Sequence, residues 1–206
     1  MITFISQHFF IQIIIFHLSV FIIPGPNMLI VARNSMLGGY KIGILSVLGI
    51  TIGIGFHIVY SSLFIIFFSE NFLQNFIWIK SFASIYLVFL SYKIYKSSKN
   101  KEKKIATGYI TPVSAFKMAL FIDLLNPAIG VFYIILWGAI LQEGIPKTNL
   151  LIAAIISITL VMLYFFLIVL FFSNQHLRKF YINNLKNMES LAAVLLLLFA
   201  LLIFKF

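Results

Sequence analysis

Two prolines and a glycine interrupt the first long apolar run of this chain, at Pro24-Gly25-Pro26-Asn27. Each proline lacks a backbone N–H, and its ring crowds the carbonyl group four residues earlier, so an ordinary helix cannot continue through this sequence. The glycine adds backbone conformations that other residues avoid. Apolar residues lie on both sides of the interruption, from about Phe4 and again from Met28. The sequence therefore predicts a broken helix inside an apolar segment.

The composition places that segment in a membrane. Of the 206 residues, 62% are hydrophobic and 10% are charged, and the mean hydropathy is +1.09. A soluble domain of this length cannot bury so much apolar surface, which indicates an integral membrane protein. Backbone groups exposed by a break in a membrane helix must meet protein or a water-filled cavity. We therefore expect the break to face the protein interior, where broken helices of transporters bind their solutes.

A helical span takes ~20 apolar residues, so the chain has room for about six spans with short links. We place them near 4–31, 42–68, 77–95, 112–141, 150–172 and 188–206, with polar links at 33–41, 70–80 and 174–187. All belong to one all-α membrane domain over residues 1–206, made of a first half (1–95), a basic linker (96–111) and a second half (112–206).

Lysine and arginine concentrate in the links after the first, third and fifth spans, which the positive-inside rule assigns to the cytoplasm. This orientation requires that the fourth span crosses fully. A re-entrant fourth segment would reverse every later loop.

A second interruption, Asn126-Pro127, lies in the first span of the second half, as Pro24–Asn27 lies in the first span of the first half. Two copies of a unit with three spans must have opposite orientations in the membrane. This placement predicts two inverted three-helix repeats whose broken helices meet around a solute, the plan of many secondary transporters.

Asp123 is the acidic residue that lies well inside an apolar segment. An ionisable side chain within the membrane is costly and is by default a candidate for function. Asp123 precedes Asn126 by about one helical turn, so both side chains can share a face. The carboxylate could bind a substrate ammonium group or take up a coupling proton. The alternative is a structural role, either pairing with Lys117 or capping a helix end at the interface.

Small residues form one face of the second span. At about 100° per residue, this face also takes in His57. The small-xxx-small spacing lets helix backbones approach closely, so a packing seam is the first interpretation and a polar path through His57 is the second. The glycines expected to pack there are Gly39, Gly43, Gly49 and Gly53.

Other functions lack the residues that they require. The chain has no cysteine, and its four histidines show no metal-ligand spacing, so we expect neither a metal nor a cofactor. An intramembrane enzyme needs a nucleophile–base pair, a metal cluster or paired carboxylates, none of which the pattern supplies. The net charge of +10 suits cytoplasmic loops and anionic lipid, and we expect no nucleic acid. A small-solute channel and a structural membrane protein remain as alternatives to a transporter.

The interruptions and their surroundings resemble the LysE/RhtB family of amino-acid exporters. The resemblance covers most of residues 1–140. It rests on four groups of residues: Pro24-Gly25-Pro26-Asn27; Gly38-Gly39-Tyr40-Lys41 with Gly43, Gly49 and Gly53; Trp78-Ile79-Lys80 with Ile85-Tyr86-Leu87 and Lys93; and Phe116, Leu124-Leu125-Asn126-Pro127 and Val131-Phe132.

This resemblance implies a multi-pass protein of the bacterial inner membrane that exports amino acids or related metabolites, driven by the proton motive force through alternating access. It also implies that both interruptions line the transport path. Half-helix N-termini then suit a substrate carboxylate, and free carbonyls or Asp123 suit its ammonium group. The partners expected are an amino acid and membrane lipid. The glycine face fits helix packing within one chain and between the subunits of a homo-oligomer alike. Neutral, hydroxylated and basic amino acids all fit this pattern.

Overall fold

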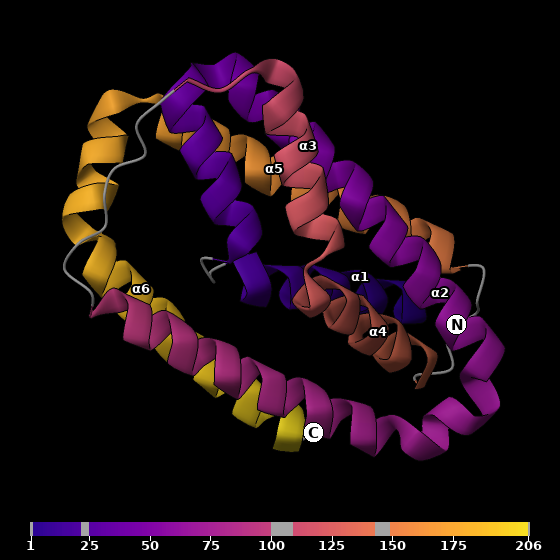
Figure 1. Ribbon diagram of the computed structural model, residues 1–206. Coiled ribbons are helices and arrows are strands. Elements are labelled where there is room, and N and C mark those ends of the chain that lie inside the picture. The colour runs from indigo at the N-terminus through magenta and orange to yellow at the C-terminus, as the bar shows by residue number, and fades with distance from the viewer. Residues whose placement is uncertain (1, 22–24, 100–108, 143–148, 206) are drawn as a thin grey trace.

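The computed structural model describes residues 2–21, 25–99, 109–142 and 149–205. These residues are almost entirely helical and contain no strand (Figure 1). The helices are α1 (Ile2–Phe21), α2 (Pro26–Ser98), α3 (Pro112–Leu124), α4 (Pro127–Gln142), α5 (Asn149–Ser173) and α6 (Gln175–Lys205).

Helix α2 is helical over 73 residues but reverses its direction near Gly39. Asn34 Nδ2 donates a hydrogen bond to Ser46 Oγ at 2.9 Å, although twelve residues of straight helix would separate the two by about 18 Å. Gly39 has φ of 68°, a left-handed conformation that favours glycine because it has no Cβ. Figure 1 shows the ribbon turning back on itself in this region, so two antiparallel arms belong to one helical segment.

The polar links predicted at 33–41, 70–80 and 174–187 are helical apart from Asn174, so the interpretation of 70–80 as a loop is wrong. Polar side chains mark exposure to water, not the conformation of the backbone. At 174–187, Asn174 begins α6 because its side-chain oxygen accepts hydrogen bonds from the N–H groups of His176 and Leu177. The first apolar segment also divides into α1 and the start of α2, with 22–24 outside the described residues.

The first span of the second half breaks where the sequence predicts. Thr111 accepts a hydrogen bond from the N–H of Ser114 and begins α3, and Pro127 is the first residue of α4. The axes of α3 and α4 are bent by 55°. Together the two helices have the length and composition of one broken span or of a re-entrant loop.

Within the described residues, two helical stretches are long and apolar enough to cross a membrane, Pro26–Ile65 and Asn149–Ser173. The bent pair of α3 and α4 adds a third if it counts as one span. The predicted arrangement of six spans in two inverted repeats therefore stays a prediction. Large apolar side chains are exposed along α2 and α5, among them Phe56 at 60% and Leu167 at 62%. Such a surface suits lipid rather than water.

The last part of α2 packs antiparallel against α6, as Figure 1 shows along the lower edge. Ser84 Oγ donates to the carbonyl of Ala200, and Ser91 Oγ donates to that of Ala193, each at 2.7 Å. From Ser84 to Ser91 the chain of α2 advances by seven residues, while the bonded carbonyl on α6 moves back by seven, from Ala200 to Ala193. The end of α2 and the end of α6 thus run in opposite directions.

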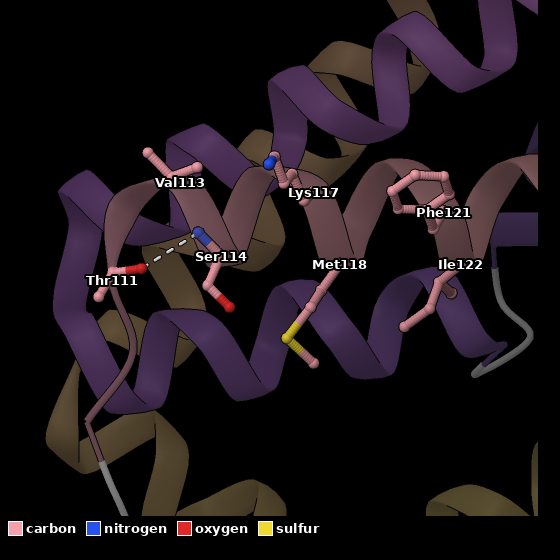
Figure 2. Close-up of a pocket in the computed structure, with 7 residues that line it drawn as sticks. All are labelled: Thr111, Val113, Ser114, Lys117, Met118, Phe121 and Ile122. Atoms are coloured by element: carbon pink, nitrogen blue, oxygen red, sulfur yellow. Dashed lines mark hydrogen bonds between the residues drawn. The ribbon is translucent and has the colours of Figure 1, made fainter.

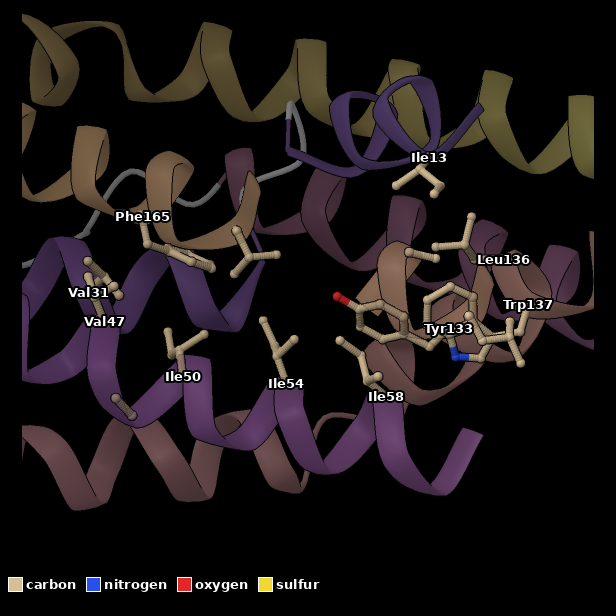
Figure 3. Close-up of a cluster of buried hydrophobic side chains, with 14 of the residues drawn as sticks. Ile13, Val31, Val47, Ile50, Ile54, Ile58, Tyr133, Leu136, Trp137 and Phe165 are labelled. Atoms are coloured by element: carbon tan, nitrogen blue, oxygen red, sulfur yellow. The ribbon is translucent and has the colours of Figure 1, made fainter. Parts of the chain in front are cut away.

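The main apolar cluster joins α1, α2, α4 and α5. Figure 3 shows Tyr133 and Trp137 of α4 beside Ile54 and Ile58 of α2, with Ile13 of α1 nearby. These side chains are buried, so the two arms around the Gly39 reversal and the helices of the second half form one packed body. This packing holds the ends of the broken helices against each other.

Candidate functional site

The two helix breaks meet through a pair of buried side chains. Asn27 lies in the first turn of α2, after the first break, and Asp123 lies at the end of α3, before the second. Asn27 Nδ2 donates a hydrogen bond to Asp123 Oδ1. Asn27 is 5% exposed and Asp123 is fully buried, so both side chains are shielded from bulk water. Residues 96 positions apart in sequence thus form one site.

Lys117, the alternative partner for Asp123, lies elsewhere on α3. Ala115, Ala119 and Asp123 repeat every four residues on the buried face, whereas Lys117 and the exposed Phe121 face away. The contacts of Asp123 come instead from Asn27 and from His57. The Asp123 side chain therefore lies in the interior of the bundle, on the face of α3 opposite to Lys117.

Pro127 leaves the backbone carbonyl of Asp123 without its usual helical donor. That carbonyl would accept from the N–H four residues later, but position 127 is proline and has no N–H. Asn126 N–H donates to this carbonyl at 2.9 Å, and His57 Nε2 lies at 2.9 Å from the same oxygen. A side chain of α2 therefore completes the hydrogen bonding of the break, as a membrane interior requires.

This contact also determines the protonation of the imidazole ring. A carbonyl oxygen only accepts, so His57 Nε2 carries the hydrogen and donates it. In the neutral ring, Nδ1 is then an acceptor, and Tyr60 Oη lies 2.8 Å from it and donates its hydroxyl proton. His57 Nε2 also lies 3.6 Å from Asp123 Oδ2. A continuous line of polar groups thus runs from the carboxyl group through the imidazole to the Tyr60 hydroxyl.

Two glycines leave space for the side chains of Asp123 and Tyr60. A Cβ added at Gly53 would overlap the Asp123 carboxylate, and one added at Gly130 of α4 would overlap the Tyr60 hydroxyl. Gly49, one turn before Gly53, lies against the backbone of α3 at Phe116 and Leu120. The spacing Gly49-x-x-x-Gly53 is therefore the seam between α2 and α3, with the carboxylate at its end.

The other two glycines of the predicted face differ from this pair. Gly43 packs closely on Ser35 and on Val169 of α5. Gly39 has no neighbouring atom within 4 Å of an added Cβ and instead forms the reversal of α2. Its role is conformational and not one of close packing.

The remaining predicted residues have varied positions. Pro24 lies outside the described residues. Gly25 has open space around it and does not adopt a positive φ, while Pro26 and Pro127 are exposed at the starts of α2 and α4. Asn126 is buried, and its Oδ1 accepts from the N–H of Ala128 at 3.2 Å. That side chain therefore caps α4.

The first break has a cap of its own. Phe21 ends α1, and its carbonyl accepts a hydrogen bond from Tyr164 Oη of α5 at 2.7 Å. The rings of Phe21 and Tyr164 stack with centroids 4.2 Å apart and planes within 4°. Each break is thus capped by a side chain from a helix distant in sequence. His57 does so for α3, and Tyr164 does so for α1.

Three buried polar atoms near the junction have no hydrogen-bond partner within the described residues. They are Asn27 Oδ1, Asp123 Oδ2 and the hydroxyl of Tyr133, which is 1% exposed. Buried polar atoms are nearly always paired, so unpaired acceptors side by side suit a cationic or hydrogen-donating solute. The described residues hold no group of three His, Asp or Glu side chains that could bind a metal ion.

A pocket of about 510 Å³ lies on the outer face of α3 (Figure 2). Its lining comes from α3 and Thr111 alone and includes Ser114, Lys117, Met118 and Phe121. It is a broad, open depression, and none of the predicted site residues lines it. The polar chemistry of the molecule lies on the opposite face of the same helix.

Sequence reasoning missed Tyr60, Tyr164 and Gly130, and it placed His57 on the packing face without a partner. A tyrosine hydroxyl or a histidine ring inside an apolar segment indicates that a backbone carbonyl elsewhere needs a hydrogen-bond donor. The pairing itself depends on how the two halves pack, which the sequence of one chain does not show.

Comparison with known proteins adds a family to this geometry. The family model described as LysE type translocator matches residues 18–205. Leucine efflux proteins of Salmonella choleraesuis, Salmonella paratyphi A and Salmonella typhimurium are each 30% identical to this chain over 131 residues. The match spans 62% of this chain and 61% of each relative. No solved structure matches significantly. Because the family model covers nearly the whole chain, the protein belongs to the LysE type translocator family.

Proposed function

We propose that this protein exports a neutral amino acid, with leucine as the first candidate, across the bacterial inner membrane in exchange for protons. The observation that carries the proposal is the contact of Asn27 with Asp123, which joins the two broken helices inside the bundle. The names of the relatives supply the class of substrate.

The junction offers complementary groups for a zwitterion. The unpaired oxygens of Asn27 and Asp123 can accept hydrogen bonds from an ammonium group. The N-termini of α2 and α4 begin at the two breaks and present the positive end of each helix dipole, which suits a carboxylate. An aliphatic side chain would meet Ile50, Ile54 and Phe165, which belong to the adjoining apolar cluster.

The burial of the site supports alternating access. Asp123 is fully buried, so a solute reaches it only after the halves rearrange. The antiparallel pairing of α2 with α6 and the reciprocal caps of the two breaks support a pair of inverted repeats that could rock against each other. A channel would need a continuous opening past Asp123.

Leucine counterflow in proteoliposomes tests this function. Unlabelled leucine inside the vesicles should drive uptake of labelled leucine, because a carrier exchanges solute across one site. Asn27→Ala should reduce this exchange to background, whereas Asn184→Ala should leave it intact. Asn184 is a half-buried asparagine of α6 whose side chain bonds to its own helix, at the carbonyl of Phe180. Equal counterflow by wild type and Asn27→Ala would contradict the assigned site.

A further inference from the structure

We infer that His57 and Tyr60 form a proton relay that connects the buried carboxyl group of Asp123 to the surface of the protein. The inference rests on the proposed function, because it supplies the route of the coupling proton. Its basis is the hydrogen bond from Tyr60 Oη to His57 Nδ1 at 2.8 Å and the approach of His57 Nε2 to within 3.6 Å of Asp123 Oδ2. The second distance is longer than a hydrogen bond, and it closes when the imidazole turns from the Asp123 carbonyl to the carboxylate.

The ends of this line lie in opposite environments. Asp123 is fully buried and His57 is 3% exposed, whereas Tyr60 is 45% exposed. Phe56, one turn earlier, is among the exposed side chains that suit lipid, so Tyr60 meets water only where this helix reaches the membrane surface. A proton taken up there can enter a site that excludes solvent. Tyr133 is buried, and its hydroxyl has no hydrogen-bond partner among the described residues, so it offers no such exit.

The transfer balances with the groups present. Tyr60 passes its hydroxyl proton to His57 Nδ1 while His57 Nε2 passes its proton to Asp123 Oδ2. Tyr60 regains a proton from water. One proton has then moved from water to the carboxylate, which becomes a neutral acid, and the ring carries its hydrogen on Nδ1. When the halves rearrange and the site opens to water, proton exchange with water returns the His57 ring to the form with its hydrogen on Nε2.

The relay points toward the outer face of the membrane. The reversal at Gly39 lies in the link that the positive-inside rule assigns to the cytoplasm. Tyr60 follows it by 21 helical residues, or about 30 Å along the helix. Protons driven inward by the proton motive force would thus meet Tyr60 before Asp123. Export in exchange for protons needs this direction.

A purely structural cap predicts a different response to mutation. His57→Gln keeps an N–H donor near the position of Nε2 and can still bond to the carbonyl of Asp123, but it cannot relay a proton. Tyr60→Phe keeps the ring and removes the hydroxyl. Tyr40→Phe is the matched control, since Tyr40 lies on the same helix, is also 45% exposed and lies outside the relay.

The experiment measures two rates for each variant in proteoliposomes, leucine counterflow at equal pH and leucine transport driven by a pH gradient. We expect His57→Gln and Tyr60→Phe to keep counterflow and to lose gradient-driven transport by roughly 100-fold, the lower end of what a positioned proton-transfer group contributes. Tyr40→Phe should keep both rates.

Three results would overturn the relay. Gradient-driven transport at the wild-type rate in both variants would show that protons use another route. Parallel loss of both rates in both variants would make the two residues structural. Absence of counterflow in the wild-type protein would remove the proposed function first, and the relay with it.

Discussion

The two helix breaks are built alike but hold different chemistry. In each, a carbonyl at the end of one helix receives a hydrogen bond from a helix distant in sequence, through Tyr164 of α5 at the first break and His57 of α2 at the second. The first break has a phenol cap and a neutral amide, Asn27. The second has an imidazole cap and a carboxyl group, Asp123. The comparison teaches that two breaks of similar construction can carry different side chains, a neutral amide at one and an ionisable carboxyl group at the other.

Exchange of the two junction side chains should give the largest effect. Asp123→Asn should abolish transport driven by a pH gradient, because it removes the proton-accepting group and keeps the size of the side chain. The double variant Asn27→Asp with Asp123→Asn returns a carboxylate to the same contact but away from His57. We expect no recovery of gradient-driven transport. Recovery to half the wild-type rate or more would show that the breaks are interchangeable.

Restoring the missing backbone N–H at position 127 should have the next largest effect on transport. Pro127→Ala gives the carbonyl of Asp123 its own helical donor, which competes with His57 and favours a straighter helix in place of the 55° bend. We expect counterflow and gradient-driven transport to fall together by about tenfold, which corresponds to ~1.4 kcal/mol. Unchanged rates would mean that the bend is not required.

A methyl group at the seam should destabilise the second break. Gly53→Ala places a Cβ on the Asp123 carboxylate, and such overpacking costs about 1–3 kcal/mol. Gly55→Ala, two residues away on the same helix, meets open space and should be tolerated. Thermal unfolding of the detergent-solubilised protein distinguishes the two. Equal midpoints would contradict the close contact at Gly53.

Removing the Tyr164 hydroxyl, which caps the first break, should have the smallest effect. Tyr164→Phe removes one hydrogen bond to the carbonyl of Phe21 and keeps the stacked ring, so the free energy of unfolding should fall by about 0.5–1.5 kcal/mol. The ratio of gradient-driven transport to counterflow should not change, because Tyr164 lies on no proton route. A changed ratio would place coupling on both breaks.

Much of the fold was predictable because membrane burial leaves strong signals. The apolar runs, the break at Asn126-Pro127 and the buried glycine face from Gly43 to His57 follow from hydropathy, proline chemistry and helical periodicity. The helical state of the polar links was not predictable from polarity alone. The link at 33–41 shows why. A single positive φ at Gly39 reverses the direction of α2, and the residues on both sides stay helical.

The candidate site was predictable in its parts but not in its connections. Asp123 stood out because a carboxyl group inside an apolar segment is costly, and Asn27 because it follows two prolines. Their contact spans 96 residues and depends on how the halves pack. The roles of His57 and Tyr60 depend on which carbonyl Pro127 leaves free, and this requires the arrangement of α2 against α3 in space.

Cross-linking across the junction tests the central claim most directly, and the chain has no native cysteine to interfere. Asn27→Cys and Asp123→Cys are combined in a protein with a protease site in the basic linker, and the membranes are treated with a short thiol cross-linker and then with protease. The account predicts that the two halves stay joined on a gel. Asn27→Cys with Phe121→Cys, on the exposed face of α3, should let them separate. Separation of the first pair, or equal linkage in both, would contradict the meeting of the two breaks.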